Sequence, residues 1–136
     1  DDAKVGAVFV QRGASSADMG MSWMLPRIVG AGRAAELMFT GDIIDAARAE
    51  HIGLFNRVVP RDQLMQAAME MAGKLAAGPP LGLKFTKRAL NRSVWEGLQS
   101  QLEYESATQT LTFLSEDFQE GVKSFYEKRK PVFRGR

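Results

Sequence analysis

The chain has 136 residues, 45% of them hydrophobic and 25% charged. This is the composition of one globular domain, and it excludes a disordered or collagen-like chain. The sequence contains no cysteine and a single histidine, His51, so disulfides, thiol nucleophiles and cysteine-ligated metals are excluded and we expect no metal site. The formal net charge of +2 is too small to indicate nucleic-acid binding, and no apolar run approaches the roughly 18 residues of a membrane span.

The first residues predict a strand, a loop and a helix, in that order. Residues 5–10 form a short apolar run that is rich in β-branched side chains, which favours a buried strand. Residues 13–20 are small and polar and therefore predict a loop. We expect a helix to begin near Met21 or Ser22, with Pro26 in its first turn or at a kink.

The next stretch predicts two short helices and a second strand. Residues 33–39 predict the first of these helices, after a break at the glycines that precede it. Asp45 is a typical N-cap residue, so we expect it to begin a helix that runs to His51. Residues 54–59 are apolar at both ends and predict a strand that Pro60 terminates.

The remaining residues predict helices alone. Residues 62–77 carry apolar side chains at helical spacing and give the clearest helix of the chain. Residues 81–90 predict another helix with a basic face. Ser93 and Glu96 have the spacing of a capping box, so a further helix is expected to start there, and Ser115 is expected to cap the last one.

The predicted strands are too few for a sheet that is stable by itself. A stable sheet normally needs about three or more strands, whereas this chain offers two short ones separated by helices. The chain is therefore either an all-α domain with incidental extended segments or a part of something larger. We favour the second interpretation.

Several segments, taken in order, resemble the C-terminal half of the enoyl-CoA hydratase/isomerase family of the crotonase superfamily. The matching segments are residues 23–30, 34–41, 46–59, 84–87 and 120–131. The resemblance implies an α/β crotonase-like fold, of which this chain would be a predominantly α-helical portion with about two short strands. It also implies a division into residues 1–60, the C-terminal end of the core, and residues 61–136, a helical region for oligomerisation and CoA contact.

The chemistry that this resemblance implies is the binding of an acyl-CoA thioester, with coenzyme A as part of the substrate and no separate cofactor. In the family, backbone N–H groups stabilise an enolate or oxyanion on the thioester oxygen, and both donors belong to an N-terminal half that this sequence does not contain. Phe9 occupies the position of a hydratase glutamate, and phenylalanine cannot transfer a proton. We therefore expect these residues alone not to hydrate an enoyl-CoA.

Asp18 is the candidate catalytic residue. Relatives that shift double bonds, isomerise ring epoxides or remove halogens carry an aspartate at the matching position, as a proton shuttle or a nucleophile. The alternative role for Asp18 is a cap of the helix that follows it. Met21 and Trp23 are candidates for an acyl pocket, and their alternative role is ordinary core packing.

The basic C-terminal region provides the candidate CoA contacts. Phe118, Val122 and Phe125 are spaced to share one helix face. By resemblance, Phe125 and Lys128 lie near the adenine and phosphates of CoA, and lysine is a suitable phosphate binder. Alternatively, the basic residues of this region keep the protein in solution and balance the helix dipole.

The sequence leads to one preferred function with an alternative. The preferred one is an acyl-CoA-binding family member that acts on an enoyl-CoA-type thioester, and the alternative is a non-catalytic helical module for oligomerisation and CoA contact. The expected partners are the thioester and further copies of the chain, as a trimer or hexamer, with the exchange of helices between copies as one form of association. We expect no nucleic-acid or membrane partner and a cytoplasmic location, because the short acidic N-terminus does not resemble a signal peptide.

Overall fold

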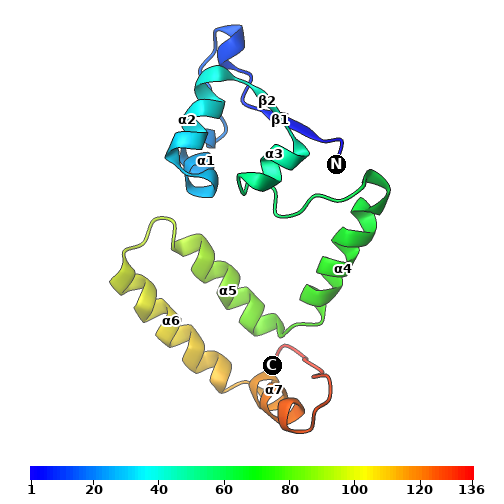
Figure 1. The fold of residues 1–136 in the computed structure, drawn as a ribbon. Helices are drawn as coiled ribbons and strands as arrows, with labels where there is room; N and C mark the ends of the chain where they lie inside the picture. The colour runs from blue at the N-terminus through cyan, green and yellow to red at the C-terminus, as the bar shows by residue number, and fades with distance from the viewer. The chain divides into compact units, whose positions relative to one another are not determined.

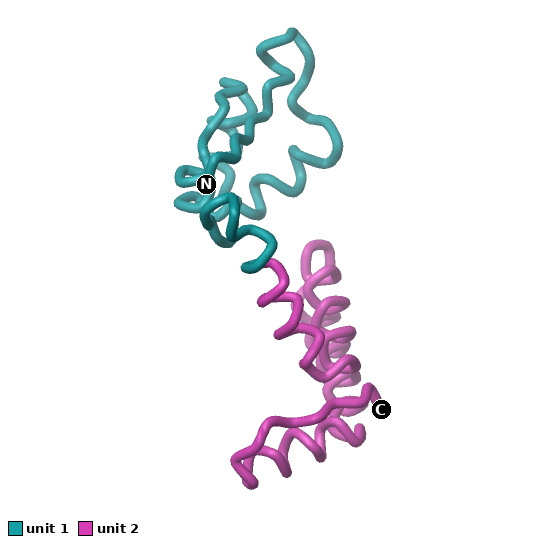
Figure 2. Tube along the Cα trace, turned by 90° about the vertical axis from the view of Figure 1, so that its right-hand side faces the viewer, with its two compact units in different colours: residues 1–67 teal, residues 68–136 magenta.

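The computed structural model describes all residues, 1–136. The chain separates into two compact units, residues 1–67 and 68–136 (Figure 2). The boundary falls inside one helix, α4 (Leu64–Ala76). The functional division at residue 60 that the sequence suggests stays a prediction.

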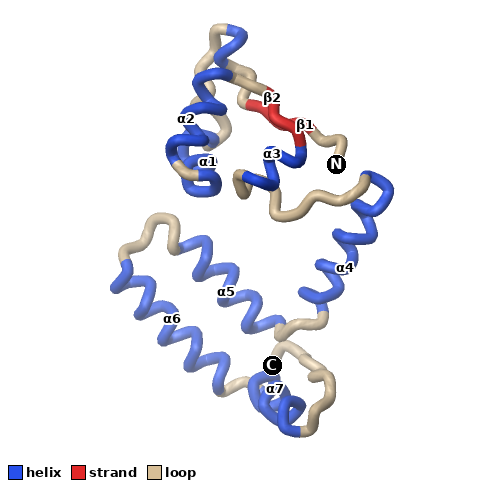
Figure 3. Tube along the Cα trace, in the orientation of Figure 1, coloured by secondary structure: helices blue, strands red, loops and turns tan.

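The first unit contains a two-stranded antiparallel sheet (Figure 3). Strand β1 (Lys4–Gly6) pairs with β2 (Ile43–Asp45), with Val5 opposite Ile44. At Gly6 the strands approach so closely that a Cβ atom would lie 2.9 Å from the Asp42 carbonyl oxygen, which explains a glycine inside a strand. The predicted strand over residues 5–10 is therefore right at its start and wrong at its end, because the chain then turns into a short 3₁₀ helix, Val10–Arg12.

The strand predicted over residues 54–59 is wrong. These residues form bends and irregular structure, and β2, which the sequence analysis missed, takes the place beside β1. The backbone groups of the segment find other partners: the Val58 N–H donates to the Glu50 carboxylate at 2.7 Å, and the Val59 carbonyl accepts from the N-terminal ammonium at 2.8 Å. Hydrogen bonds to side chains and to the terminus thus replace a strand ladder.

Three helices complete the first unit and form its core (Figure 1). They are α1 (Met21–Val29), α2 (Ala31–Thr40) and α3 (Ala46–His51). The predicted cap of α3 is confirmed, since the Arg48 N–H donates to the Asp45 carboxylate at 2.8 Å. The buried cluster joins all three helices or their ends: Leu25, Val29, Ala34, Leu37 and Ile52.

The second unit consists of the rest of α4 and three further helices, α5 (Pro80–Arg92), α6 (Leu98–Phe113) and α7 (Glu116–Tyr126). Helices α5 and α6 pack side by side as a hairpin (Figure 1). The predicted capping box is wrong: the Ser93 hydroxyl donates to the Leu90 carbonyl at 2.7 Å at the end of α5, and α6 begins only after Gly97.

The last helix begins where the sequence predicts. The Ser115 hydroxyl accepts the Phe118 N–H at 3.1 Å, which is the geometry of an N-cap. After α7 the chain folds back along the helix, and the Asp117 carboxylate accepts the N–H groups of Arg134 and Gly135 at 2.6 and 2.8 Å. No helix of the chain has both the length and the apolar character that a membrane crossing requires.

Candidate functional site

The Asp18 carboxylate is exposed on the loop that leads into α1. Its Oδ1 accepts the N–H of Met19 at 2.8 Å, while the Asp18 carbonyl accepts the N–H of Met21 at 2.8 Å. The N-cap position of α1 is Gly20, with a φ of +77° and no side-chain cap. The expectation that Asp18 caps α1 is therefore wrong, because a glycine in the left-handed region separates its carboxylate from the first turn.

The two candidate pocket residues on α1 have different surroundings. Met21 is half-buried and packs against the core cluster of the first unit, as the core-packing alternative expects. Trp23 is 41% exposed, and the Arg27 guanidinium carbon lies 4.1 Å from the centre of its ring. Residues two positions apart point to different helix faces, so the structure does not bring these two side chains to one surface.

Phe125 and Lys128 lie together at the end of α7. The Lys128 N–H donates to the Phe125 carbonyl at 3.2 Å, and both side chains are exposed, Phe125 to 79%. The Phe125 ring stands edge-on to Tyr126, with 5.9 Å between the ring centres. An exposed aromatic ring and an ammonium group three residues away are the elements that a nucleotide-like ligand would contact.

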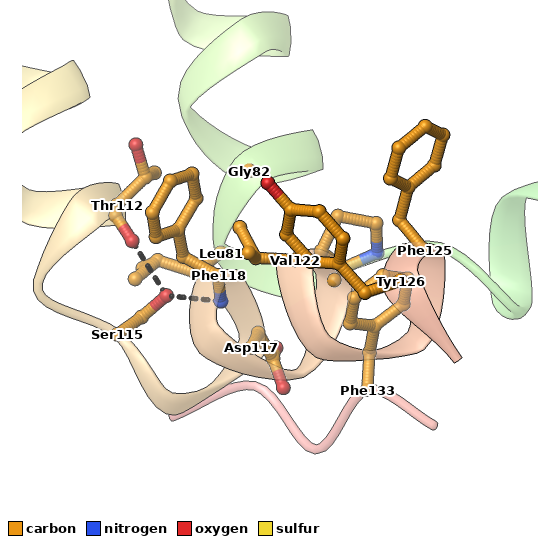
Figure 4. Close-up of a pocket in the computed structure, with 12 residues that line it drawn as sticks. Leu81, Gly82, Thr112, Ser115, Asp117, Phe118, Val122, Phe125, Tyr126 and Phe133 are labelled. Carbon is orange, nitrogen blue, oxygen red and sulfur yellow. Dashed lines mark hydrogen bonds between the residues drawn. The ribbon is translucent and has the colours of Figure 1, made fainter. Parts of the chain in front are cut away.

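Phe125 is one of the residues that line an apolar pocket of about 480 Å³ (Figure 4). The start of α5, the end of α6, α7 and the C-terminal segment form its walls. The side chains that give it its apolar character are Leu81, Phe118, Val122, Phe125, Tyr126 and Phe133. Phe118, Val122 and Phe125 line this one pocket together, so their predicted common face is confirmed.

Sequence reasoning missed Leu81, Tyr126 and Phe133 as pocket residues. Tyr126 continues the four-residue spacing of Phe118 and Val122, so the helical pattern could have included it, whereas Leu81 comes from a different helix. Phe133 reaches the pocket because the C-terminal segment folds back, and its ring lies 3.7 Å from the position of a Cβ on Gly121. No local periodicity signals such a return of the chain.

Ion pairs hold the C-terminal segment against α7. The Arg129 guanidinium donates to both oxygens of Glu120 at 2.5 and 2.8 Å, and the Val132 N–H donates to the same carboxylate at 2.9 Å. These hydrogen bonds, that of Arg129 first, lower the pKa of Glu120 from 4.5 to about 2. The same pair raises the pKa of Arg129. A further ion pair joins Arg136 to Glu116 at 2.9 Å.

The structure shows no place where three or more His, Asp or Glu side chains gather in a way that suits a metal ion. The candidate functional groups are thus a carboxylate in the first unit, and an aromatic ring, an ammonium group and an apolar pocket in the second. Such a set offers proton transfer and contacts to an aromatic, anionic ligand.

Comparison with known proteins places the chain in one family. The Enoyl-CoA hydratase/isomerase family matches residues 1–136. The chain is 35% identical over 133 residues to the "Probable enoyl-CoA hydratase EchA12" of Mycobacterium tuberculosis, covering 93% of this chain and 45% of that protein. It is 37% identical over 119 residues to the 1,2-epoxyphenylacetyl-CoA isomerase of Escherichia coli, covering 88% of this chain and 45% of the isomerase.

A solved structure agrees with this assignment. The crystal structure of a "probable enoyl-CoA hydratase/isomerase" from Mycobacterium abscessus superposes with a TM-score of 0.95 at 31% identity, covering 99% of this chain and 53% of that one. The chain therefore belongs to the enoyl-CoA hydratase/isomerase family and has the fold of the C-terminal portion of a crotonase. It spans about half the length of the relatives that it matches.

Proposed function

We propose that this chain provides the acid–base carboxylate and the CoA contacts of a family member that acts on an enoyl-CoA-type thioester. The observation that carries the proposal is the exposed Asp18 carboxylate, which has no capping role and lies on a loop of a chain that belongs to this family. The names of its relatives include both a hydratase and an isomerase of acyl-CoA compounds.

In this reaction Asp18 takes a proton from a carbon of the acyl chain and returns it at another carbon. The electrons left by the first transfer move toward the thioester oxygen, which becomes the oxygen of an enolate. Backbone N–H donors stabilise that charge, and they belong to the N-terminal half that the family resemblance implies. Asp18 is suited to the transfer because its loop is exposed and made of small residues, so that a substrate carbon approaches it closely.

In the second unit, Phe125 and Lys128 bind the CoA moiety of an acyl-CoA thioester. The exposed Phe125 ring offers a face for the adenine base, and the Lys128 ammonium offers a charge for a phosphate. Both groups come from one short stretch at the end of α7, so a ligand that touches one is within reach of the other.

The experiment is the substitution Asp18→Asn in a longer chain that includes an N-terminal half like that of the relatives. Turnover should fall by roughly a hundred- to ten-thousand-fold, the usual contribution of a general acid–base group. Asparagine keeps the oxygen that accepts the Met19 N–H, so stability and thioester binding should not change. Turnover of a series of enoyl-CoA thioesters, thioester affinity and thermal unfolding are measured together.

Asp42→Asn is the matched control, because it makes the same chemical change at another exposed carboxylate of the first unit. It should leave turnover unchanged. Full activity of the Asp18→Asn protein on every thioester that the parent accepts would refute the catalytic role. The 136-residue chain by itself should not hydrate crotonyl-CoA above background.

A second candidate, a non-catalytic module for oligomerisation and CoA contact, is supported by α4. None of the side chains of this 13-residue helix is buried within the chain, although helices of this length are marginal without a packing partner. Self-association and catalysis are compatible, so the two candidates differ only in catalysis, and the turnover of thioesters by the longer chain decides between them. A cytoplasmic location belongs to the same proposal and is supported by the acyl-CoA enzymes among the relatives.

A further inference from the structure

The turn that follows α7 holds Lys128 in an uncommon backbone conformation. Its φ is +54°, in the left-handed region that glycine adopts far more readily than lysine. The Arg129 N–H donates to the Ser124 carbonyl at 3.1 Å and the Lys128 N–H to the Phe125 carbonyl at 3.2 Å. These two bonds form a Schellman motif, in which the residue at the position of Lys128 is usually glycine.

The guanidinium of Arg129 closes this turn. Its Nε donates to the Glu127 carboxylate at 2.6 Å, so the two neighbours of Lys128 are joined to each other and Lys128 is at the tip of the turn. Its Nη1 and Nη2 donate to the Glu120 carboxylate at 2.5 and 2.8 Å. Glu120 lies on α7, before the helix ends at Tyr126. Because the guanidinium binds Glu127 through Nε and Glu120 through Nη1 and Nη2, it fixes the backbone on either side of Lys128.

The Glu120 carboxylate also holds the chain beyond the turn, because it accepts the Val132 N–H at 2.9 Å. One carboxylate thus fixes the segment on both sides of Lys130. The N–H groups of Arg129 are occupied by Glu120, Glu127 and the Lys130 carbonyl. Lys128, in contrast, is exposed and makes no ion pair with a carboxylate, so its ammonium is available to an anionic ligand.

We infer that Glu120 is a positioning residue for CoA: through Arg129 it holds Lys128 in a left-handed turn, beside Phe125, where its ammonium meets a phosphate. The role of Lys128 as phosphate ligand rests on the proposed function, whereas the hold of Glu120 on the turn does not. Residues keep unfavourable backbone conformations where the surrounding structure enforces them, and such places are frequent at binding sites.

The first test measures the turn itself in the 136-residue chain. The three-bond coupling between the amide and α protons of Lys128, together with its backbone chemical shifts, reports φ in solution. We expect a positive φ in the unmodified chain, and a shift toward negative φ in Glu120→Gln. The matched control is Glu116→Gln, which removes the ion pair with Arg136 and should leave Lys128 unchanged. A Lys128 that keeps its positive φ in Glu120→Gln overturns the inference.

The second test measures the affinity for free coenzyme A by calorimetric titration. Lys128→Ala should weaken binding roughly five- to tenfold, as for one exposed charge-assisted contact. Glu120→Gln should weaken it by a similar factor, and the double variant no further, because both changes remove the same contact. Arg129→Lys keeps the charge without the fork and should give an intermediate loss.

The outcomes separate the inference from the proposed function. An additive loss in the double variant, or normal affinity in Glu120→Gln beside a weakened Lys128→Ala, overturns the positioning role. Normal affinity in Lys128→Ala counts against the CoA contact in the proposed function instead. In that case the measured φ still decides whether Glu120 holds the turn.

Discussion

Lys128, the proposed phosphate contact, has a backbone conformation that is unfavourable for a lysine. A side chain with a Cβ atom in the left-handed region is disfavoured by roughly 1–2 kcal/mol, and Lys128 occupies that region with a φ of +54°. Glycine is the residue that this position of a Schellman motif favours. The chain therefore holds a lysine where stability alone favours glycine, which fits a residue kept for what its ammonium contacts.

Lys128→Gly should accordingly stabilise the fold while it removes the proposed phosphate contact. We expect the free energy of unfolding to rise by about 1 kcal/mol, from relief of the left-handed strain. Chemical denaturation measures this change, and coenzyme A titration measures the loss of affinity. Lys130→Gly is the control, since Lys130 lies in the irregular segment after the turn and its replacement should be neutral or slightly destabilising. A lower free energy of unfolding in Lys128→Gly would contradict the claim that the left-handed conformation of Lys128 destabilises the fold.

The role of Asp18 as a cap was a reasonable sequence prediction that the backbone excludes. Aspartate before a helix usually caps it, but two consecutive residues with positive φ, Met19 at +48° and Gly20 at +77°, turn the chain between Asp18 and α1. The sequence shows that Gly20 can adopt backbone conformations that other residues avoid, but it does not show which of them Gly20 adopts. The candidate carboxylate was thus found by family resemblance, and its freedom from the helix was found by the structure.

At the scale of elements, sequence patterns predicted a hydrogen bond correctly where its donor and acceptor are close in sequence. Asp45 and Ser115 each bind an N–H three residues ahead, so a short pattern contains the whole interaction. The pattern at Ser93 and Glu96 has the same spacing, yet Arg92 pairs with Glu96 at 3.3 Å and Ser93 ends α5. Strand β2 pairs with residues about 40 positions away, and no local pattern selects it over residues 54–59.

The two serines give a direct test of which one caps a helix. Ser115→Ala should lower the free energy of unfolding by about 1 kcal/mol, because the Phe118 N–H then loses its acceptor. Ser93→Ala removes only a hydroxyl that donates to the Leu90 carbonyl, and should cost less than half as much. Urea denaturation of both variants measures the difference. Equal losses would mean that Ser115 does not act as a cap.

At the scale of the whole chain, we expect the stability of the fold to depend on pH because Glu120 holds the C-terminal segment. Its pKa is lowered in the fold from 4.5 to about 2, first by the hydrogen bond from Arg129 and then by that from the Val132 N–H. A carboxyl with a lowered pKa adds stability above its ordinary pKa and loses that contribution as the pH falls through the lowered value. Stability should therefore decrease progressively between about pH 4.5 and pH 2.

Thermal unfolding across this pH range compares the unmodified chain with Glu120→Gln. The variant has no carboxyl to titrate at this position, so its midpoint should depend less steeply on pH between about 4.5 and 2. Glu116→Gln, whose carboxylate forms a more exposed pair with Arg136, serves as the comparison. Parallel curves for the unmodified chain and the Glu120→Gln variant would show that the ion pair with Arg129 does not stabilise the fold.

The exposed apolar side chains of α4 lead to the last prediction, that the chain associates with itself. They are Leu64, Met65, Met69, Met71 and Leu75, each more than half exposed. Contiguous apolar surface of this kind drives association in water, and a short helix gains most of its stability from packing. We therefore expect the 136-residue chain to form oligomers at micromolar concentration.

Light scattering coupled to gel filtration measures the mass. Replacing Met65 and Met69 together by glutamate places two charges one turn apart on the exposed surface of α4, and should shift the population toward monomer. Met19→Glu is the matched control, because it changes an exposed methionine outside α4, and it should leave the mass unchanged. A monomeric mass for the unmodified chain, or equal masses for the α4 variant and the control, would exclude α4 as the surface through which copies of the chain associate.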